Sequence, residues 1–186
     1  MEKSHYHRQG SLDGLCGHYA IVNALTVCGA LKGWRKQQAM LLEIWDRHKE
    51  LYEGMYFYEM RRVIHYLQRS RKWPAGVAAH ALSENGTVQR NRDEYLKQIF
   101  SERNVQCAVI QVQRCEDDWE DHWLVIKRSI GRLQFIDSVD QNGRKIIRKD
   151  RTSLKMGRQK NKHSRSSMWR LIKPREAILF KSVKED

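Results

Sequence analysis

The sequence lacks any long apolar run. No stretch of about 18 apolar residues is present, which excludes a helix of the kind that spans a membrane. The opening residues, MEKSHYHRQG, contain no apolar core of the kind found in secretion signals. We therefore expect a cytoplasmic protein that makes no contact with a membrane.

Cysteine is scarce as well. The chain has four cysteines, too few and too scattered for a disulfide scaffold, and no two of them form the short-spaced pair that is typical of zinc sites. We therefore predict reduced thiols, no bound metal and no cofactor. The cysteines are Cys16, Cys28, Cys107 and Cys115.

Acidic residues are few relative to basic ones. Lys and Arg number 35 and Asp and Glu number 22, which gives a formal net charge of +13. Such an excess favours acidic partners, nucleic acid or an acidic protein among them, although an ordinary basic soluble protein is an equal alternative. With 186 residues, 40% of them hydrophobic, the chain is long and apolar enough for one globular domain with a sizeable core.

The first part of the chain, residues 1–103, is predicted to be mainly helical. Apolar residues recur there at the spacing of an amphipathic helix. The helix that starts at Cys16 is apolar nearly all round, which is typical of a helix in the centre of a domain. Further helices are predicted over Trp34–Lys49, Tyr56–Gln68 and Arg92–Glu102.

The second part, residues 104–186, is predicted to be mainly β-structure, because short runs rich in Val and Ile replace the helical period. The strongly basic stretch 149–167 has few large apolar side chains and is predicted to be a loop. Helices first and strands later indicate an α+β fold within a single domain, residues 1–186. The predicted strands are Gly76–Leu82, Val105–Gln113, His122–Arg128, Arg132–Asp137, Trp169–Ile172 and Ala177–Val183.

The residues Gln9–Leu25, QGSLDGLCGHYAIVNAL, contain the strongest candidate for a reactive group. Cys16 stands between Gly14 and Gly17 at the start of the buried helix. The positive end of a helix and a neighbouring imidazole both stabilise a thiolate, the form of cysteine that attacks well. We predict that Cys16 is a nucleophile; an inert thiol in the core is the alternative.

A nucleophilic cysteine needs a base, and the chain has eight histidines. His18 is close in sequence, but residues two apart on a helix point in different directions. His122 is the best candidate because it opens a predicted strand, HWLVIKR, that is followed by a second strand ending in Asp137. His80, on a strand of small residues, is the alternative.

The length of the loop between these two strands decides whether His122 and Asp137 lie on the same face. A two-residue loop at Ser129-Ile130 pairs His122 with Asp137, and one at Ile130-Gly131 makes them diagonal neighbours. Both registers put the two side chains on one face, whereas a three-residue loop would put them on opposite faces. The same face would carry Leu124, Ile126, Leu133 and Phe135.

Two further groups complete the predicted site. A carboxylate behind the base fixes its tautomer and stabilises the imidazolium, the role that we assign to Asp137, with Asp140 and Asn142 as rivals. Gln9, upstream of Cys16, can supply a side-chain amide to an oxyanion hole together with a backbone N–H.

These motifs, QG…DGLCGHYAIVNAL, DHWLVI and FIDS, resemble those of the papain-like cysteine peptidases, and among them most resemble the small C39-type bacterial peptidases. The resemblance implies N-terminal helices that carry the nucleophile, packed on a C-terminal antiparallel sheet. It also implies Gln9 as the oxyanion donor, Cys16 as the nucleophile, His122 as the base and acid, and Asp137 as the residue that orients His122.

We therefore expect a cysteine peptidase that hydrolyses peptide or isopeptide bonds of a protein or peptide substrate through a thioester. Two alternatives remain. One is a papain-like binding module whose basic stretch 149–167 engages nucleic acid without sequence specificity, or an acidic protein. The other is a papain-fold acyltransferase, similar to transglutaminase-like effectors, which passes the acyl group to an amine instead of to water.

Overall fold

The fold was analysed in a computed structural model, which describes residues 15–49, 54–82, 92–102, 104–114, 121–129, 132–136, 154–156, 169–171 and 176–183. Gln9 and Asp137 lie outside these residues, as does most of the basic stretch 149–167.

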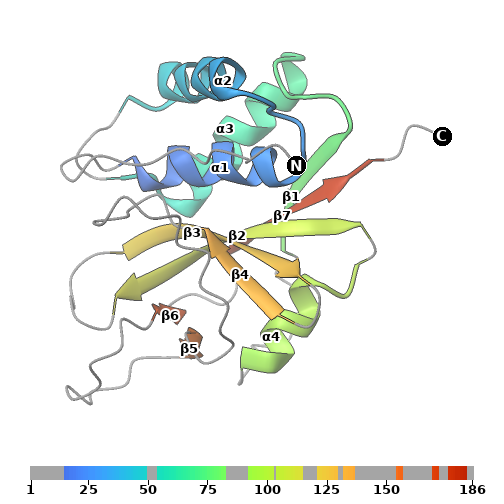
Figure 1. Cartoon of the computed structure of the whole chain (residues 1–186). Helices are drawn as coiled ribbons and strands as arrows, with labels where there is room; N and C mark the ends of the chain where they lie inside the picture. Colours follow the sequence, from blue (N-terminus) through green and yellow to red (C-terminus); the bar gives the residue numbers. More distant parts are fainter. Residues whose placement is uncertain are drawn as a thin grey trace.

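The described residues form an α+β fold, as predicted (Figure 1). Helices open the chain, and most strands follow them. The elements in chain order are α1 (Cys16–Val27), α2 (Trp34–Arg47), α3 (Phe57–Arg69), β1 (Val77–Ala81), α4 (Arg92–Ile99), β2 (Val105–Arg114), β3 (Asp121–Ser129), β4 (Arg132–Ile136), β5 (Leu154–Met156), β6 (Trp169–Leu171) and β7 (Ala177–Ser182).

Five strands form a continuous antiparallel sheet in the order β1-β7-β2-β3-β4. The short strand β6 extends the sheet beside the end of β2, and β5 pairs with β6 in parallel. The N-terminal part thus contributes a strand of its own, β1, which pairs with β7 about a hundred residues later in the chain.

The sheet separates two apolar clusters (Figure 1). Helices α1, α2 and α3 lie over one face, and their buried side chains pack with Val109, Trp123, Val125 and Phe180 of the sheet. Helix α4 lies below the other face and packs there through Tyr95 and Ile99. Because side chains alternate along a strand, each central strand contributes to both clusters.

Helix α1 is the centre of the first cluster. Nearly all of its side chains are buried, including Ile21, Val22 and Leu25, which agrees with the prediction of a helix that is apolar nearly all round. Its last residue is Val27, and Gly29 follows the C-cap residue Cys28 with a φ of +75°, a conformation that glycine adopts without strain. The N–H groups of Gly29 and Ala30 donate to the carbonyls of Thr26 and Leu25, which closes the helix in a Schellman motif.

Most predicted elements are present, with ends that differ by a few residues. The predicted inward face of α3, which consists of Met60, Val63, Ile64 and Leu67, is buried as expected. One prediction was wrong: the basic stretch 149–167 is not all loop, because Leu154–Met156 forms strand β5. Its pairing with β6 depends on a partner strand that the composition of the stretch itself does not reveal.

Candidate active site

Cys16 is the first residue of α1 and is 7% exposed. Its sulfur belongs to the cluster between the three helices and the sheet. The N-cap residue is Leu15, whose side chain cannot accept a hydrogen bond, and the first turn contains no acidic residue. The positive end of the helix is therefore not neutralised by a carboxylate of its own first turn.

Gly17 makes this helix start unusually close to another segment. A Cβ atom at Gly17 would lie 2.7 Å from Cβ of Met55, a distance that packed carbon atoms do not reach. The glycine next to Cys16 is therefore required by the approach of Met55. The structure thus gives a packing reason for the glycine beside Cys16.

Met55 also binds the strand that carries the candidate base. The indole Nε1–H of Trp123 donates to the carbonyl oxygen of Met55 at 2.6 Å, and the Trp123 ring stacks on Phe57 with centroids 6.3 Å apart. Met55 thus joins the residue after Cys16 to the residue after His122. The starts of α1 and of β3 lie at the same end of the molecule (Figure 1).

His122 is the second residue of β3 and is buried, with 9% of its surface exposed. It pairs with Val112 of β2 in the sheet register. Leu124 and Ile126 follow it at the strand period of two and belong to the cluster on the α4 face, whereas Trp123 belongs to the cluster that contains Cys16.

The alternation of side chains along β3 bears on the predicted contact between Cys16 and His122. In a regular strand the His122 side chain shares the face of Leu124 and not that of Cys16. A contact between Cys16 and His122 therefore requires the imidazole to approach the sulfur around the beginning of β3.

The β3–β4 hairpin has one of the two predicted registers. Ser129 pairs with Arg132, which leaves Ile130 and Gly131 between them, and the described pairing ends at Val125 opposite Ile136. The three-residue loop that would have separated the two faces is thereby excluded. The predicted face is also present, since Leu124, Ile126, Leu133 and Phe135 share one cluster.

The two other predicted site residues, Gln9 and Asp137, lie outside the described residues. Asp137 directly follows Ile136, the last described residue of β4, and Gln9 precedes Leu15, where the description starts. Their roles therefore stay predictions from the sequence.

A buried pair of histidines lies beside the start of α1. Nε2–H of His18 donates to the carbonyl oxygen of His48 at 2.9 Å, and the two rings are 5.1 Å apart. Burial lowers the pKa of His18 to about 4, and the nearby His48 adds to this shift, although the hydrogen bond to the carbonyl opposes it. His18 is therefore neutral at pH 7, and its Nδ1 finds no hydrogen-bond partner in the described structure.

Glu59 connects this pair to the Met55 segment. Its Oε2 accepts the backbone N–H of Tyr56 at 2.7 Å and lies 3.2 Å from Nε2 of His48, within ion-pair distance but outside hydrogen-bond geometry. Glu59 thus fixes the residue after Met55 at the start of α3. Sequence reasoning missed both Met55 and Glu59; the Glu three residues after the N-cap Tyr56 is the only signal that points to the latter.

The far end of α1 carries a second thiol. Cys28 follows the last residue of the helix and is half-buried, and a hydrogen bond from Cys107 lowers its pKa. Burial raises the pKa of Cys107 itself, whose Sγ also lies 3.6 Å from the carbonyl oxygen of Ala24. Cys28 and Cys107 are thus thiols outside the candidate site with which Cys16 can be compared.

Within the described residues, no three His, Cys, Asp or Glu side chains are grouped so that they could hold a metal ion. None of the helices in this part of the chain is long and apolar enough to cross a membrane. Comparisons with protein-family models, curated proteins and solved structures found no match for this chain.

Proposed function

We propose that this protein is a cysteine-dependent hydrolase of peptide or isopeptide bonds, with a papain-like arrangement of a helix-borne nucleophile and a strand-borne base. The observation that carries the proposal is the link through Met55. It joins the first turn of α1, where Cys16 lies, to Trp123, the neighbour of His122.

In the proposed reaction His122 takes the thiol proton of Cys16, and the resulting thiolate attacks the carbonyl carbon of the scissile bond. The oxygen takes the negative charge, stabilised by backbone N–H groups at the start of α1 and by the Gln9 amide. His122 then protonates the leaving amine, the C–N bond breaks and a thioester remains. Water, deprotonated by His122, attacks the thioester and releases the acid and the free thiol.

Each residue has one stated role. Cys16 is the nucleophile, His122 moves the proton, and Asp137 holds the imidazole in the tautomer that can accept it. Met55 and Glu59 act indirectly, because they fix the start of α1 against β3. The proposal requires His122 to reach the sulfur around the beginning of β3, as described above.

The test is hydrolysis of a peptide-amide library with a mass-spectrometric readout. Loss of the nucleophile in Cys16→Ala is expected to reduce turnover by about 10⁴-fold or more, as for nucleophiles in other hydrolases. Cys28→Ala, which removes the thiol at the other end of the same helix, is the matched control and is expected to keep full turnover.

Full hydrolysis by Cys16→Ala would reject the proposal, as would equal losses in the two variants. The products also separate hydrolysis from acyl transfer, because water releases a free acid, whereas an added amine would be found in the product mass.

A further inference from the structure

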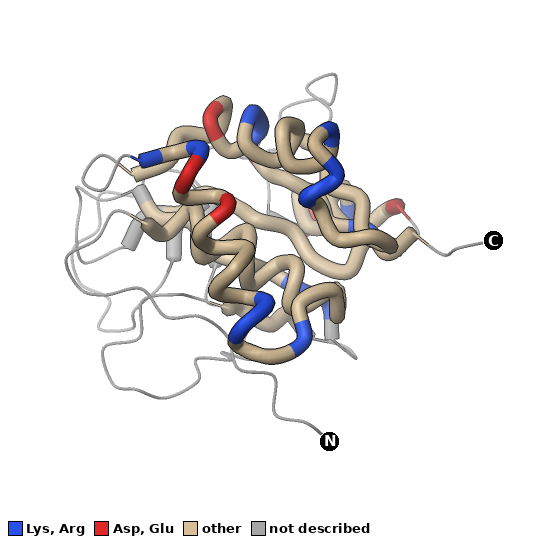
Figure 2. Tube along the Cα trace, turned by 90° about the horizontal axis from the view of Figure 1, so that it is seen from above, with Lys and Arg blue, Asp and Glu red and all other residues tan. Residues whose placement is uncertain are grey.

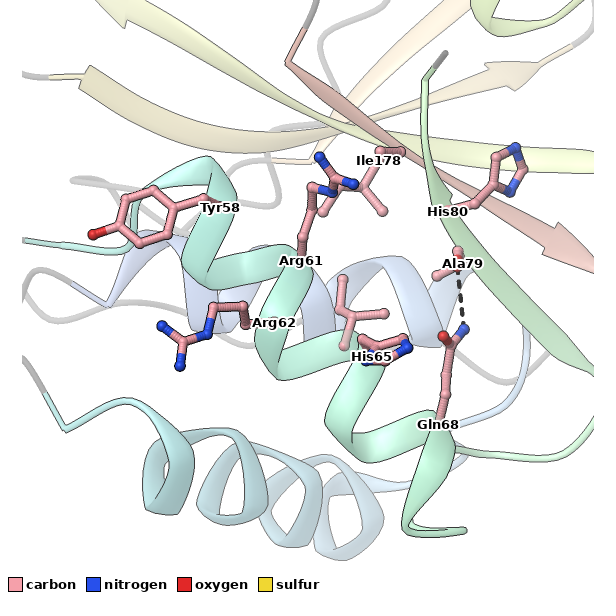
Figure 3. Close-up of a pocket in the computed structure, with 10 residues that line it drawn as sticks. Tyr58, Arg61, Arg62, His65, Gln68, Ala79, His80 and Ile178 are labelled. Atoms are coloured by element: carbon pink, nitrogen blue, oxygen red, sulfur yellow. Dashed lines mark hydrogen bonds between the residues drawn. The ribbon is translucent and has the colours of Figure 1, made fainter. Parts of the chain in front are cut away.

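A groove with an aliphatic floor runs between α3 and the edge strand β1, away from the candidate nucleophile. It encloses a cavity of about 590 Å³. Ile64 of α3, Ala79 of β1 and Ile178 of β7 line its floor (Figure 3). A cavity of this size accommodates one or two aliphatic side chains of a ligand.

The rim of the groove is cationic. Arg61, Arg62 and His65 line it from α3, and among the described residues no carboxylate lines it. Arg61 extends toward Ile178, whereas Arg62 points away from it on the helix (Figure 3). Burial, followed by the Lys181 ammonium, lowers the pKa of His80 on β1, so the charge at neutral pH comes from the arginines.

The exposed surface of α3 beside the groove has the same sign, whereas on the β1 side Glu102 lies 3.5 Å from His80. Exposed residues of α3 include Arg61, Arg62 and Arg69, while its single acidic residue, Glu59, is half-buried against His48. Seen from above, the helices carry Lys and Arg positions with some Asp and Glu positions among them (Figure 2). This surface attracts an anionic partner and repels a cationic one.

The edge of β1 is not open for strand pairing. The carbonyl oxygen of Val77 accepts Nε1–H of Trp73 at 2.9 Å, and that of Ala79 accepts the side-chain amide of Gln68 at 3.1 Å. Side chains thus occupy backbone groups that an added strand would need. A ligand of the groove is therefore recognised through its side chains.

We propose that the groove between α3 and β1 binds an acidic segment of a partner protein, with one aliphatic side chain on the Ile64–Ile178 floor and a carboxylate beside Arg61. A single-stranded nucleic acid would use the arginines equally well. The ring of Tyr58 also lines the groove and could stack on a base, so a nucleic acid is the competing occupant; the aliphatic floor of Ile64, Ala79 and Ile178 matches an aliphatic side chain instead. The proposal does not depend on the chemistry of Cys16.

The test measures fluorescence anisotropy of a short fluorescein-labelled peptide in which Glu pairs alternate with Leu, added to the full chain. Two control peptides replace Leu by Ser or Glu by Gln, and an oligo(dT) strand represents nucleic acid. The Glu-Leu peptide is expected to bind most tightly. The affinity should fall about tenfold in Arg61→Glu, which places a like charge beside the ligand.

Matched variants separate the groove from the overall charge. Arg35→Glu makes the same charge change at an exposed position on α2 and is expected to leave the affinity nearly unchanged. Ala81→Phe, which fills the groove from β1, is expected to weaken binding without a change of charge. Circular dichroism melts verify that each variant folds. If Arg61→Glu does not fold, the affinities of the single variants Ala81→Phe and Arg61→Gln are used instead.

Three results would overturn the proposal. The first is equal binding of the Leu and Ser peptides, which would show that the floor is not used. The second is tighter binding of oligo(dT) than of the Glu-Leu peptide. The third is an equal loss in Arg35→Glu and Arg61→Glu, which would leave only the net charge as the cause.

Discussion

The two ends of α1 resemble each other in sequence and differ in construction. Each end has a cysteine next to a glycine, Cys16-Gly17 at the start and Cys28-Gly29 at the finish. The start has no side-chain cap and is held by contacts from other segments, Met55 above all. The finish is closed by its own backbone and by Cys107. A nucleophile is expected only at the start, where the helix dipole favours an anion.

The largest expected effect on stability is a decrease in the free energy of unfolding at acidic pH, caused by His18 near the start of α1. The pKa of His18 is lowered to about 4, so the unfolded chain, with a pKa near 6.5, binds a proton that the folded chain does not. Stability should therefore decrease as the pH falls from about 6.5 to about 4, by up to about 3 kcal/mol from this group.

Urea unfolding at several pH values checks this expectation. His18→Phe keeps a ring but cannot be protonated, so the variant should lose that part of the pH dependence. The difference between the two pH profiles gives the contribution of His18 apart from those of Glu59 and His48. Identical pH profiles for the two proteins would show that His18 is not the buried neutral group described.

The two glycines should respond to alanine for different reasons. A Cβ at Gly17 collides with Met55, so Gly17→Ala is expected to cost about 2–3 kcal/mol and to displace the start of α1. A Cβ at Gly29 meets nothing within 4 Å, and the φ of +75° alone makes Gly29→Ala cost about 1 kcal/mol.

Chemical denaturation of both variants measures the two costs. A further readout distinguishes them, because only Gly17→Ala should also reduce hydrolysis by the folded protein. A larger loss of unfolding free energy in Gly29→Ala than in Gly17→Ala would contradict the close contact between Gly17 and Met55.

A further comparison of the two ends concerns the hydrogen bond from Trp123. Trp123→Phe leaves the buried carbonyl of Met55 without its donor, at a cost of about 1–3 kcal/mol. Cys107→Ala at the other end of α1 removes a weaker contact and should reduce turnover less than Trp123→Phe does. Measured unfolding energies and turnover of the two variants test this, and equal turnover losses would contradict a specific role of Trp123 in fixing β3.

Much of this arrangement could be predicted because it is local. The burial of α1 and the inward face of α3 follow from their apolar patterns. A hairpin near Ser129 was predicted as well, but two loop positions stayed open, and the structure has the one at Ile130-Gly131. The period of two along β3 also placed His122 with Leu124 in advance.

What could not be predicted depends on contacts between distant segments. The alternation in β3 does not say which face α1 covers, and in the fold α1 lies on the face of Trp123. Likewise, no local pattern links Met55 to Gly17 or pairs β5 with β6. Such contacts are set by tertiary packing, which a single sequence does not display.

The central claim, that Cys16 is activated by His122, is tested most directly by the rate of alkylation of each thiol with iodoacetamide at neutral pH. Exposure alone predicts that half-buried Cys28 reacts faster than Cys16. The hydrogen bond from Cys107, which lowers the pKa of Cys28, makes that thiol a demanding control. We predict that Cys16 reacts about tenfold faster than Cys28 and slows to its rate in His122→Gln. A Cys16 that reacts no faster than Cys28, or a rate that His122→Gln leaves unchanged, would contradict the claim.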